Sequence, residues 1–336
     1  MEKASSPLWL SEEQVQDLLT PEEAYAAVAK GLVCHARGQY QQPLKPYIRP
    51  KGREEERTGG RFIAMPAFLG GKMQAAGIKW IAGFPANIDI GLPRASGLVA
   101  LNSTETGRLL ALMPCETLSA RRTAAVASLS VDYLAQSGEK RIAMIGAGPI
   151  AKSVLEALGS GPDRNIAEVR LCDLRVQRAE ELARLLAQSG KRLPHIQVSD
   201  SAEESIRHAN VIVTATTGSK GYIKNEWIQE GALSVPLSLD DCEPDVLLSA
   251  DKVLVDDFDQ CCREEKLLHR LVQAGQFSRE RIYALLGEVV AGMKEGRTNH
   301  AERIYMNAMG MAVEDVAAAQ AVYNKARERG VGYVLP

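Results

Sequence analysis

The sequence predicts an α/β protein with two domains, and three observations lead to that prediction. The chain has 336 residues, which at about 150 residues per domain is enough for two. From Lys140 onward, strand-like runs alternate with helical runs, a pattern typical of a parallel sheet with right-handed crossovers. Before Lys140, short strand-like runs are separated by Gly, Asn and Pro, as hairpin turns require. We therefore expect a parallel α/β domain and a mixed α+β domain.

The elements of the mixed domain follow from local signals. Ser11 is predicted to cap one helix and Thr20 a second, which has Pro21 at its first position. Strands are predicted over residues 61–66, 75–81, 95–101 and 108–112. The charged run 51–60 is predicted to be a solvated hairpin tip. An Ala-rich helix over 118–134 then connects the two halves.

The second half predicts the parallel sheet. Strands are expected over 141–145, 169–172, 195–198, 211–215, 233–237 and 253–255, with helices over 149–158, 176–188 and 202–208. The last helix, about 311–327, follows the sheet and is expected to pack back on the first domain. We therefore expect residues 1–125 and 305–336 to form the mixed domain, and residues 126–304 to form the parallel one.

Composition limits the classes of partner. Lys and Arg total 40 and Asp and Glu total 42, so the formal net charge is −2. A near-neutral chain has no electrostatic attraction for nucleic acid or an anionic membrane. No apolar run approaches the roughly 18 residues of a membrane-spanning helix, and no signal-peptide pattern is visible. The six cysteines lack zinc-ligand spacing. We expect a cytoplasmic protein with reduced thiols, no metal and a small-molecule partner.

The segment after the first parallel strand carries a phosphate-binding motif. Gly146, Gly148 and Ala151 form a GxGxxA pattern between a predicted strand and a predicted helix, the context in which such a pattern binds a dinucleotide. The first glycine permits the tight turn, the second lets the backbone approach a pyrophosphate, and the alanine permits close helix–strand packing. The helix N-terminus attracts the phosphates. The parallel domain is thus predicted to be a Rossmann domain.

An acidic residue bears on which nicotinamide dinucleotide binds. Asp173 ends the second strand, where a carboxylate hydrogen-bonds a ribose 2′-hydroxyl and repels a 2′-phosphate. This favours NAD over NADP, although Arg175 is near enough in sequence to leave that choice open. Thr216 ends the fourth strand and is either a cofactor contact or an ordinary strand-end threonine.

Further segments, spread along nearly the whole chain, carry a family resemblance. They are residues 77–80 with 84–87, 101–107, 119–125, the glycine motif, 214–217 with Trp227, and 310–315. In this order they resemble the ornithine cyclodeaminase/mu-crystallin family. The resemblance implies a Rossmann domain plus a mixed substrate-binding and dimerisation domain made from both chain ends, and therefore a homodimer.

Four segments, residues 79–87, 91–97, 237–241 and 303–307, resemble the branch of the family that serves siderophore pathways. That resemblance implies NAD-dependent oxidation of N-(2-amino-2-carboxyethyl)-L-glutamate at the glutamyl α-carbon. Hydrolysis of the resulting imine would give 2-oxoglutarate and L-2,3-diaminopropionate. The alternatives are an ornithine cyclodeaminase, an imine reductase or opine-type dehydrogenase, and a non-catalytic ligand carrier.

A substrate with three carboxylates needs a cationic site, and arginine binds carboxylates through a planar fork. By resemblance, Arg49, Lys79 and Arg122 occupy the substrate-carboxylate positions, and Arg94 belongs to the siderophore branch. The alternative for each is a surface ion pair. Lys79 is also a catalytic candidate, because the pKa of a lysine falls when it is buried.

Imine hydrolysis needs a group that exchanges protons with water and nitrogen. By resemblance, Asp241 holds the catalytic acid/base position, and the neighbouring Asp240 is the alternative if the register shifts by one residue. The expected cofactor contacts are Arg122, Thr123, Gly146, Gly148, Pro149, Ile150, Ala151, Asp173, Thr216, Ser238 and Asn307.

Overall fold

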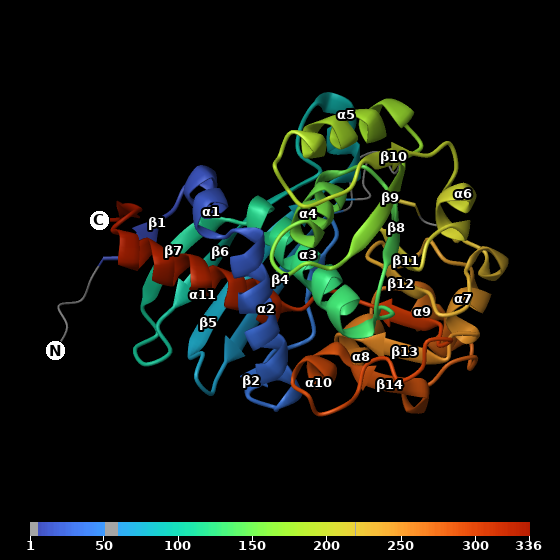
Figure 1. Ribbon diagram of the computed structural model, residues 1–336. Helices are drawn as coiled ribbons and strands as arrows, with labels where there is room; N and C mark the ends of the chain where they lie inside the picture. Colours follow the sequence, from blue (N-terminus) through green and yellow to red (C-terminus); the bar gives the residue numbers. More distant parts are fainter. Residues whose placement is uncertain (1–5, 51–59, 219) are drawn as a thin grey trace. The chain divides into compact units, whose positions relative to one another are not determined.

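The chain forms two compact units in the structure, a computed structural model that describes residues 6–50, 60–218 and 220–336 (Figure 1). Unit 1 comprises Met1–Arg122 and Met311–Pro336, and unit 2 comprises Thr123–Gly310. Unit 1 holds a mixed sheet and unit 2 a parallel sheet, so the predicted α/β class is confirmed. The hairpin tip predicted at 51–60 lies, except for Gly60, outside the described residues.

Unit 1 is built on a sheet in the order β16-β1-β7-β6-β5-β4-β2, with β3 paired to β4. The long strands β4 to β7 pair antiparallel, whereas β1 pairs parallel with β7. The strands are β1 Leu8–Trp9, β2 Tyr40–Gln41, β3 Tyr47–Ile48, β4 Arg61–Leu69, β5 Ala75–Gly83, β6 Ala95–Asn102, β7 Leu109–Pro114 and β16 Tyr333–Val334. A short 3-10 helix, η2 Pro85–Ile90, precedes β6.

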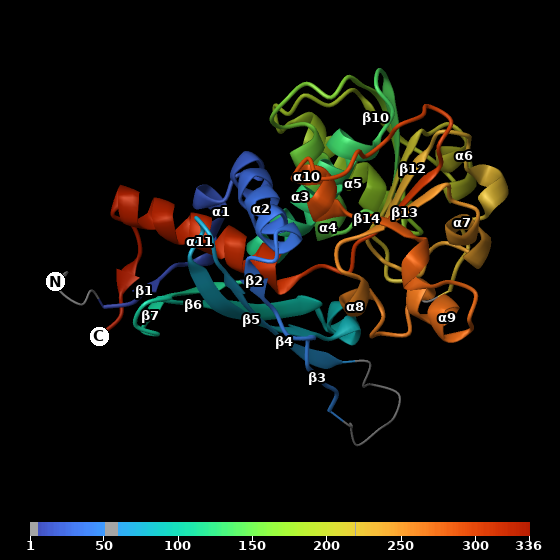
Figure 2. The same cartoon turned by 90° about the horizontal axis from the view of Figure 1, so that it is seen from below.

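Helices cover one face of this sheet (Figure 2). They are α1 Glu12–Leu18, α2 Pro21–Ala36 and α11 Ala312–Arg329, and α11 packs on β4, β5 and β6. Ser11 and Thr20 cap α1 and α2 as predicted, through hydrogen bonds to backbone N–H groups. A Cβ at Gly31 of α2 would lie 3.0 Å from the Cβ of Ala317, so glycine lets α2 and α11 approach closely. The C-terminal helix thus joins unit 1, as the sequence predicts.

Unit 2 is built on a parallel sheet in the order β10-β9-β8-β11-β12-β15-β13-β14. Its strands are β8 Lys140–Ile145, β9 Ile166–Cys172, β10 Ile196–Val198, β11 Val211–Thr214, β12 Leu233–Pro236, β13 Lys252–Val255, β14 Ile282–Leu285 and β15 Ile304–Asn307. Its helices are α4 Pro149–Leu158, α5 Val176–Ala187, α6 Ala202–Arg207, α7 Pro244–Leu248, α8 Phe258–Cys261, α9 Leu267–Gln273 and α10 Leu286–Val290, with the 3-10 helices η3 Asn225–Trp227 and η4 Arg279–Arg281. Helix α3, Glu116–Leu134, begins in unit 1 and ends in unit 2.

Strand β15 differs from the sequence expectation, which ended the parallel domain at residue 304. The strand lies between β12 and β13 and pairs in parallel with both, so residues 305–310 belong to unit 2. All four residues of β15 are buried. A buried four-residue strand that inserts between two strands from earlier in the chain has no local signal for its position. Its place matters because it brings Asn307 to the C-terminal edge of the sheet.

Candidate functional site

The C-terminal edge of the unit 2 sheet carries the glycine motif. Gly146 follows β8 with φ +102°, a conformation that L side chains rarely adopt, and a Cβ there would lie 2.6 Å from the carbonyl oxygen of Ala215. Gly148 is the N-cap of α4, no side chain caps the helix, and a Cβ would meet nothing within 4 Å. Ala151 is fully buried. The turn therefore leaves open space at a helix N-terminus, where a pyrophosphate fits.

Asp173 supports this turn from the end of β9. Its Oδ2 accepts a hydrogen bond from the N–H of Ala147 at 2.8 Å, and its Oδ1 accepts one from the N–H of Arg175 at 2.9 Å. An ionised carboxylate has about four lone-pair positions, so Asp173 retains acceptor capacity for ribose hydroxyls. Arg175 is exposed at the start of α5.

Asn307 lies farther along the same edge, at the end of β15. Its Nδ2 donates to the Sγ of Cys261 at 3.2 Å. Its Oδ1 is buried and has no hydrogen-bond partner in the part of the chain that the structure describes. A buried acceptor without a donor costs free energy, and the carboxamide N–H of a nicotinamide is the kind of donor that would satisfy it. The residues of this edge thus fit a nicotinamide dinucleotide.

Asp241 lies beyond β12, in a turn where Leu239 has φ +71°. Its side chain is fully buried, and its backbone carbonyl accepts hydrogen bonds from the N–H groups of Tyr222 and Ile223. Both carboxylate oxygens accept hydrogen bonds from hydroxyls: Oδ2 from Thr214 and Oδ1 from Thr216. The predicted acid/base is therefore held by threonine hydroxyls at the end of β11.

The neighbouring Asp240 has different surroundings. Its carboxylate forms ion pairs with Lys266, the N-cap of α9, and, at 2.9 Å, with Arg270 in the last turn of that helix. Two cations already satisfy this carboxylate, whereas Asp241 contacts the cofactor-side residue Thr216. The two acids that the sequence left open therefore differ in their partners: cations hold Asp240, and hydroxyls hold Asp241.

Ser238 lies in the same turn as Asp241 and joins that turn to the end of β11. Its Oγ accepts a hydrogen bond from the N–H of Thr216 at 2.8 Å and lies 3.1 Å from the Oγ1 of Thr214. Tyr222 also lies beside Thr216, and burial, with the charge of Asp241, raises the pKa of the Tyr222 phenol.

Two of the cationic candidates of unit 1, the buried Lys79 and the partly buried Arg122, form a cluster of charges with acids of α11. Lys79 of β5 is 1% exposed, and its Nζ binds the Oγ of Ser119 at 2.9 Å and the Oδ1 of Asp315 at 2.8 Å. Arg122 binds Glu314 at 2.8 Å and the same Asp315 oxygen at 3.0 Å. The two acids are fully buried in the first turn of α11, where the helix dipole favours negative charge.

The sequence expectation placed Lys79 and Arg122 in a cationic site and did not identify the two acids that pair with them. Burial lowers the pKa of Lys79, the charge of Asp315 opposes that effect, and the charge of Arg122 reinforces it. Burial also raises the pKa of the nearby Cys115 thiol to about 12. The acids belong to the family segment 310–315. Two adjacent acids in a segment shared with the family were the one sequence feature that could have predicted partners for Lys79 and Arg122.

Arg49 and Arg94 are exposed and lie apart from this cluster. The guanidinium of Arg49 lies 4.9 Å from the ring centre of Tyr47, and that of Arg61 lies 5.4 Å from the same ring. Partial burial and the charge of Arg61 lower the pKa of Arg94. The four predicted cations therefore divide into a buried pair, Lys79 and Arg122, and an exposed pair accompanied by Arg61, which the sequence reasoning missed.

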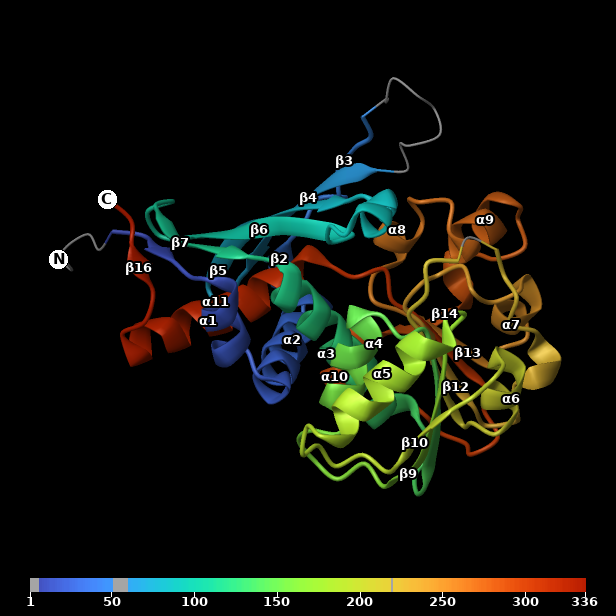
Figure 3. The ribbon, with the colours of Figure 1, turned by 90° about the horizontal axis from the view of Figure 1, so that it is seen from above.

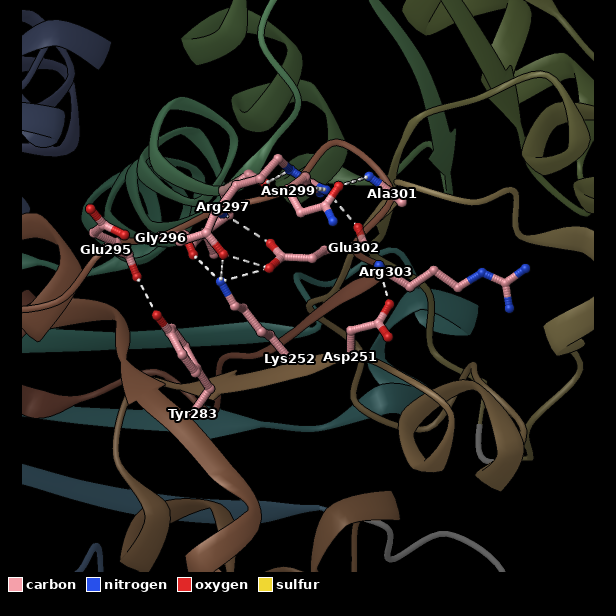
Figure 4. A network of polar contacts seen from close by, with 12 residues as sticks. Asp251, Lys252, Tyr283, Glu295, Gly296, Arg297, Asn299, Ala301, Glu302 and Arg303 are labelled. Atoms are coloured by element: carbon pink, nitrogen blue, oxygen red, sulfur yellow. Dashed lines mark hydrogen bonds and ion pairs between the residues drawn. The ribbon is translucent and has the colours of Figure 1, made fainter.

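A second polar network lies at the opposite edge of the unit 2 sheet, where β13 and β15 begin (Figure 4). Lys252 binds Glu302 at 2.9 Å, the carbonyl of Gly296 at 3.0 Å and the hydroxyl of Thr298 at 2.8 Å. Arg297 donates to backbone carbonyls, including that of Glu302. These bonds join the loop after α10 to the start of two strands. The network is structural and distant from the cofactor edge of the sheet.

Two features, a metal-binding cluster and a membrane-spanning helix, are absent from the residues that the structure describes. No group of three or more His, Cys, Asp or Glu side chains is arranged to hold a metal ion. No helix within residues 6–50, 60–218 and 220–336 is both long enough and apolar enough to cross a membrane.

The chain matches the sequence model of the ornithine cyclodeaminase/mu-crystallin family over residues 6–330. The chain belongs to this family. It is 36% identical over 312 residues to the N-((2S)-2-amino-2-carboxyethyl)-L-glutamate dehydrogenase of Staphylococcus aureus, an alignment that covers 92% of this chain and 91% of that one. The resemblance to the ornithine cyclodeaminase/mu-crystallin family that the sequence motifs indicated is thus confirmed.

Solved structures of the family agree with the fold over the whole chain. The Thermococcus litoralis Δ1-pyrroline-2-carboxylate reductase, in complex with NADH and L-proline, superposes with a TM-score of 0.88 at 29% identity, covering 98% of this chain and 100% of that one. An archaeal alanine dehydrogenase dimer with bound NAD gives a TM-score of 0.85 at 32% identity, covering 98% and 99%. The Rossmann assignment of unit 2 is therefore confirmed.

Proposed function

We propose that this protein catalyses the NAD-dependent oxidative hydrolysis of N-(2-amino-2-carboxyethyl)-L-glutamate to 2-oxoglutarate and L-2,3-diaminopropionate, in the cytoplasm, as a step toward a siderophore. The chain is an NAD-dependent oxidoreductase that acts on the CH–NH bond of an amino-acid substrate. The observation that carries the specific substrate is the 36% identity with the Staphylococcus aureus dehydrogenase over nearly the full length of both chains.

The distribution of charge in unit 1 supports a substrate with several carboxylates. Lys79 and Arg122 share Asp315, so the buried cluster can take one carboxylate at the cost of loosening an existing ion pair. Within the described residues, no carboxylate pairs with Arg94, whose neighbour is the guanidinium of Arg61. Arg94 therefore supplies cationic charge for a carboxylate that Lys79 and Arg122 do not bind, and Arg49 is proposed for another on the family resemblance.

In this proposal unit 2 supplies the chemistry. NAD+ accepts the hydride from the glutamyl α-carbon. The glycine motif, Asp173 and Asn307 hold the dinucleotide, and Thr123 and Ser238 lie among its expected contacts. Asp241 is the acid/base for hydrolysis of the imine, because it is a carboxylate at the cofactor edge with which no cation of the described residues pairs. Lys79 orients a substrate carboxylate or the water.

The proposal is tested by incubating the purified chain with NAD+ and the glutamate–diaminopropionate adduct. We expect NADH absorbance at 340 nm and equal amounts of 2-oxoglutarate. The variant Arg94→Ala is expected to raise KM for this substrate at least tenfold, roughly the loss of one charge-assisted contact. Absence of both products from the wild-type protein would reject the proposal.

A second candidate is imine reduction, which the similarity to the Thermococcus litoralis reductase favours. Oxidation of NADH by Δ1-pyrroline-2-carboxylate, without activity on the adduct, would establish it. The same assay separates the two remaining alternatives. Proline and ammonia from ornithine without net NADH would indicate a cyclodeaminase, and ligand binding without turnover would indicate a carrier.

We also propose a homodimer, formed through the face of the unit 1 sheet that its helices leave uncovered (Figure 3). Alternate residues of the strands point to opposite faces. Met65, Lys79 and Val99 are paired across the sheet and buried beneath α11, whereas their neighbours Trp80 and Leu98 pair on the other face. Leu98 is 37% exposed. An apolar sheet face that no described helix covers fits a second copy of this chain, and the similar archaeal alanine dehydrogenase is a dimer.

The assembly is tested by light scattering after size-exclusion chromatography. We expect twice the mass of the chain for the wild type and the monomer mass for Leu98→Glu. A monomeric wild type would reject the homodimer without affecting the proposed reaction.

A further inference from the structure

The burial of Asp241 raises a chemical problem for the proposed reaction. The side chain is 0% exposed, and each carboxylate oxygen already accepts a hydrogen bond from a threonine hydroxyl. A general base must come within hydrogen-bonding reach of the proton that it removes, directly or through one intervening group. Asp241 therefore needs another residue to reach a water at the surface of the site.

The hydrogen bonds around Asp241 have a fixed direction. An ionised carboxylate is an acceptor only, so Thr214 and Thr216 each donate their hydroxyl hydrogen to it. The Oγ1 of Thr216 in turn accepts the N–H of Gly218 at 3.1 Å. The Oγ of Ser238 accepts the N–H of Thr216 and is left to donate to the Oγ1 of Thr214. Every hydrogen bond in both chains thus points toward Asp241.

The two chains differ in how near they come to solvent. The contact of Thr214 with Asp241 is buried, and Thr214 is 1% exposed. The contact of Thr216 with Asp241 is partly exposed, as is Thr216 itself. At Gly218 a Cβ would lie 3.4 Å from both the Oγ1 of Thr216 and the Oδ1 of Asp241, so any side chain there would cover the hydroxyl. Thr216 is the less buried end of the network, and the phenol of Tyr222 is hydrogen-bonded to it.

We propose that the hydroxyl of Thr216 contacts the hydrolytic water and relays its proton to Asp241. This inference rests on the proposed function. As the water oxygen bonds to the imine carbon, the C=N π pair moves to nitrogen, a water proton passes to the Oγ1 of Thr216, and the threonine proton passes to the Oδ1 of Asp241. In the collapse of the carbinolamine the same path returns a proton to nitrogen, the C–N bond breaks, and the carbinolamine hydroxyl loses its proton to solvent as the ketone forms.

The relay separates hydride transfer, which does not need it, from hydrolysis, which does. The test variants are Thr216→Val, which removes the hydroxyl at nearly constant shape, and Thr216→Ser, which restores it. Thr217→Val is the matched control, because Thr217 is the next residue of the same loop and is exposed. Tyr222→Phe tests whether the phenol beside Thr216 is instead the terminal group of the relay.

We expect Thr216→Val to give a burst of about one NADH per site, followed by steady-state turnover reduced roughly 100-fold, the scale of lost general acid–base catalysis. The dissociation constant of NADH, measured by fluorescence titration, is expected to stay within about threefold of the wild-type value, since one neutral contact contributes little. Thr216→Ser, Thr217→Val and Tyr222→Phe are expected to turn over at close to the wild-type rate without a burst.

Three results would overturn the relay: normal steady-state turnover in Thr216→Val, loss of NADH affinity in proportion to turnover with no burst, or a burst in Tyr222→Phe instead. Failure of the proposed function has a different signature, because the wild-type protein would then release neither NADH nor 2-oxoglutarate from the adduct.

Discussion

Two buried acids, one in each unit, are held in opposite ways. Asp315 of unit 1 lies between Lys79 and Arg122, so charge is compensated by charge. Asp241 of unit 2 accepts hydrogen bonds from two neutral hydroxyls, and its net charge remains. A buried charge that is hydrogen-bonded but not neutralised is costly to keep, which is typical of groups retained for chemistry. A neutralised cluster instead fixes the positions of its members.

The comparison predicts that the two acids fail differently when they are replaced. Replacing Asp241 by Asn alters proton transfer and removes the acceptor of one of the two threonine hydroxyls, because an amide nitrogen only donates. Removing the charge of Asp315 leaves Lys79, 1% exposed, without its counter-charge, and this is a loss of folding free energy before it is a loss of activity.

The largest effect is expected for Asp241→Asn. The amide keeps the shape of the carboxylate but cannot accept a proton, so kcat with the adduct is expected to fall about 1,000-fold, within the usual range for an acid/base group. The free energy of unfolding is expected to fall by about 1–2 kcal/mol, for one lost hydrogen bond, and the dissociation constant of NADH is expected to stay near the wild-type value. Steady-state assays, urea denaturation and fluorescence titration measure these quantities. A variant that keeps turning over would show that Asp241 is a structural acid, like Asp315.

Asp315→Asn is expected to lower the free energy of unfolding by about 3–4 kcal/mol, because it leaves a buried lysine unpaired. Urea denaturation measures this loss. The double variant Lys79→Met with Asp315→Leu is expected to recover most of it, while remaining inactive, and Arg122 keeps Glu314 as its partner. As a control, Asp259→Asn breaks an exposed pair with Arg279 and is expected to change stability by less than about 1 kcal/mol.

The adjacent acids Asp240 and Asp241 sharpen the comparison within unit 2. Asp240→Asn removes the partner of Lys266 and Arg270, which are both partly exposed. We expect a loss of about 2 kcal/mol in unfolding free energy, with kcat within about threefold of the wild type because no proton transfer passes through this residue. A fall in kcat as large as that of Asp241→Asn would mean that the acid/base has been assigned one residue too late.

The sequence predicted the locally encoded elements of unit 2 better than those that depend on pairing between distant strands. The glycine motif and the strand–helix alternation of unit 2 are local patterns, so the Rossmann domain and the bounds of α4 were predicted correctly. The position of β15 depends on pairing with strands from earlier in the chain, and the predicted boundary accordingly fell inside it.

The candidate site shows the same limit. Lys79, Arg122 and Asp241 were found because their types and positions match a family, but that Lys79 and Arg122 share Asp315 is a contact across 236 residues of sequence. Likewise, the hydroxyls that hold Asp241 belong to a different strand from the turn that carries it. Partners that only the folded chain brings together decide whether a charge is compensated, and local patterns do not contain them.

The smallest expected effect concerns the pair at the other edge of unit 2. Burial alone would raise the pKa of the Glu302 carboxyl, but hydrogen bonds from Thr298 and Lys252 outweigh it and lower that pKa from 4.5 to about 2. A carboxyl whose pKa is depressed by folding stabilises the fold fully above its unfolded pKa and loses that contribution as the pH falls through the folded value. The stabilisation by Glu302 should therefore be complete at pH 6 and fade between about pH 4.5 and pH 2.

The variant Glu302→Gln isolates this contribution from the acid response of the other carboxyls. At pH 6 it is expected to be about 1–2 kcal/mol less stable than the wild type, because an ion pair at a partly exposed position is screened by solvent. The difference should shrink steadily in urea titrations at lower pH while the fold persists. If the Glu302–Lys252 ion pair were as fully buried as the Lys79–Asp315 pair, the difference at pH 6 would be about 3–5 kcal/mol. The difference in unfolding free energy at pH 6 therefore shows whether solvent screens the Glu302–Lys252 pair or whether the pair behaves as a fully buried one.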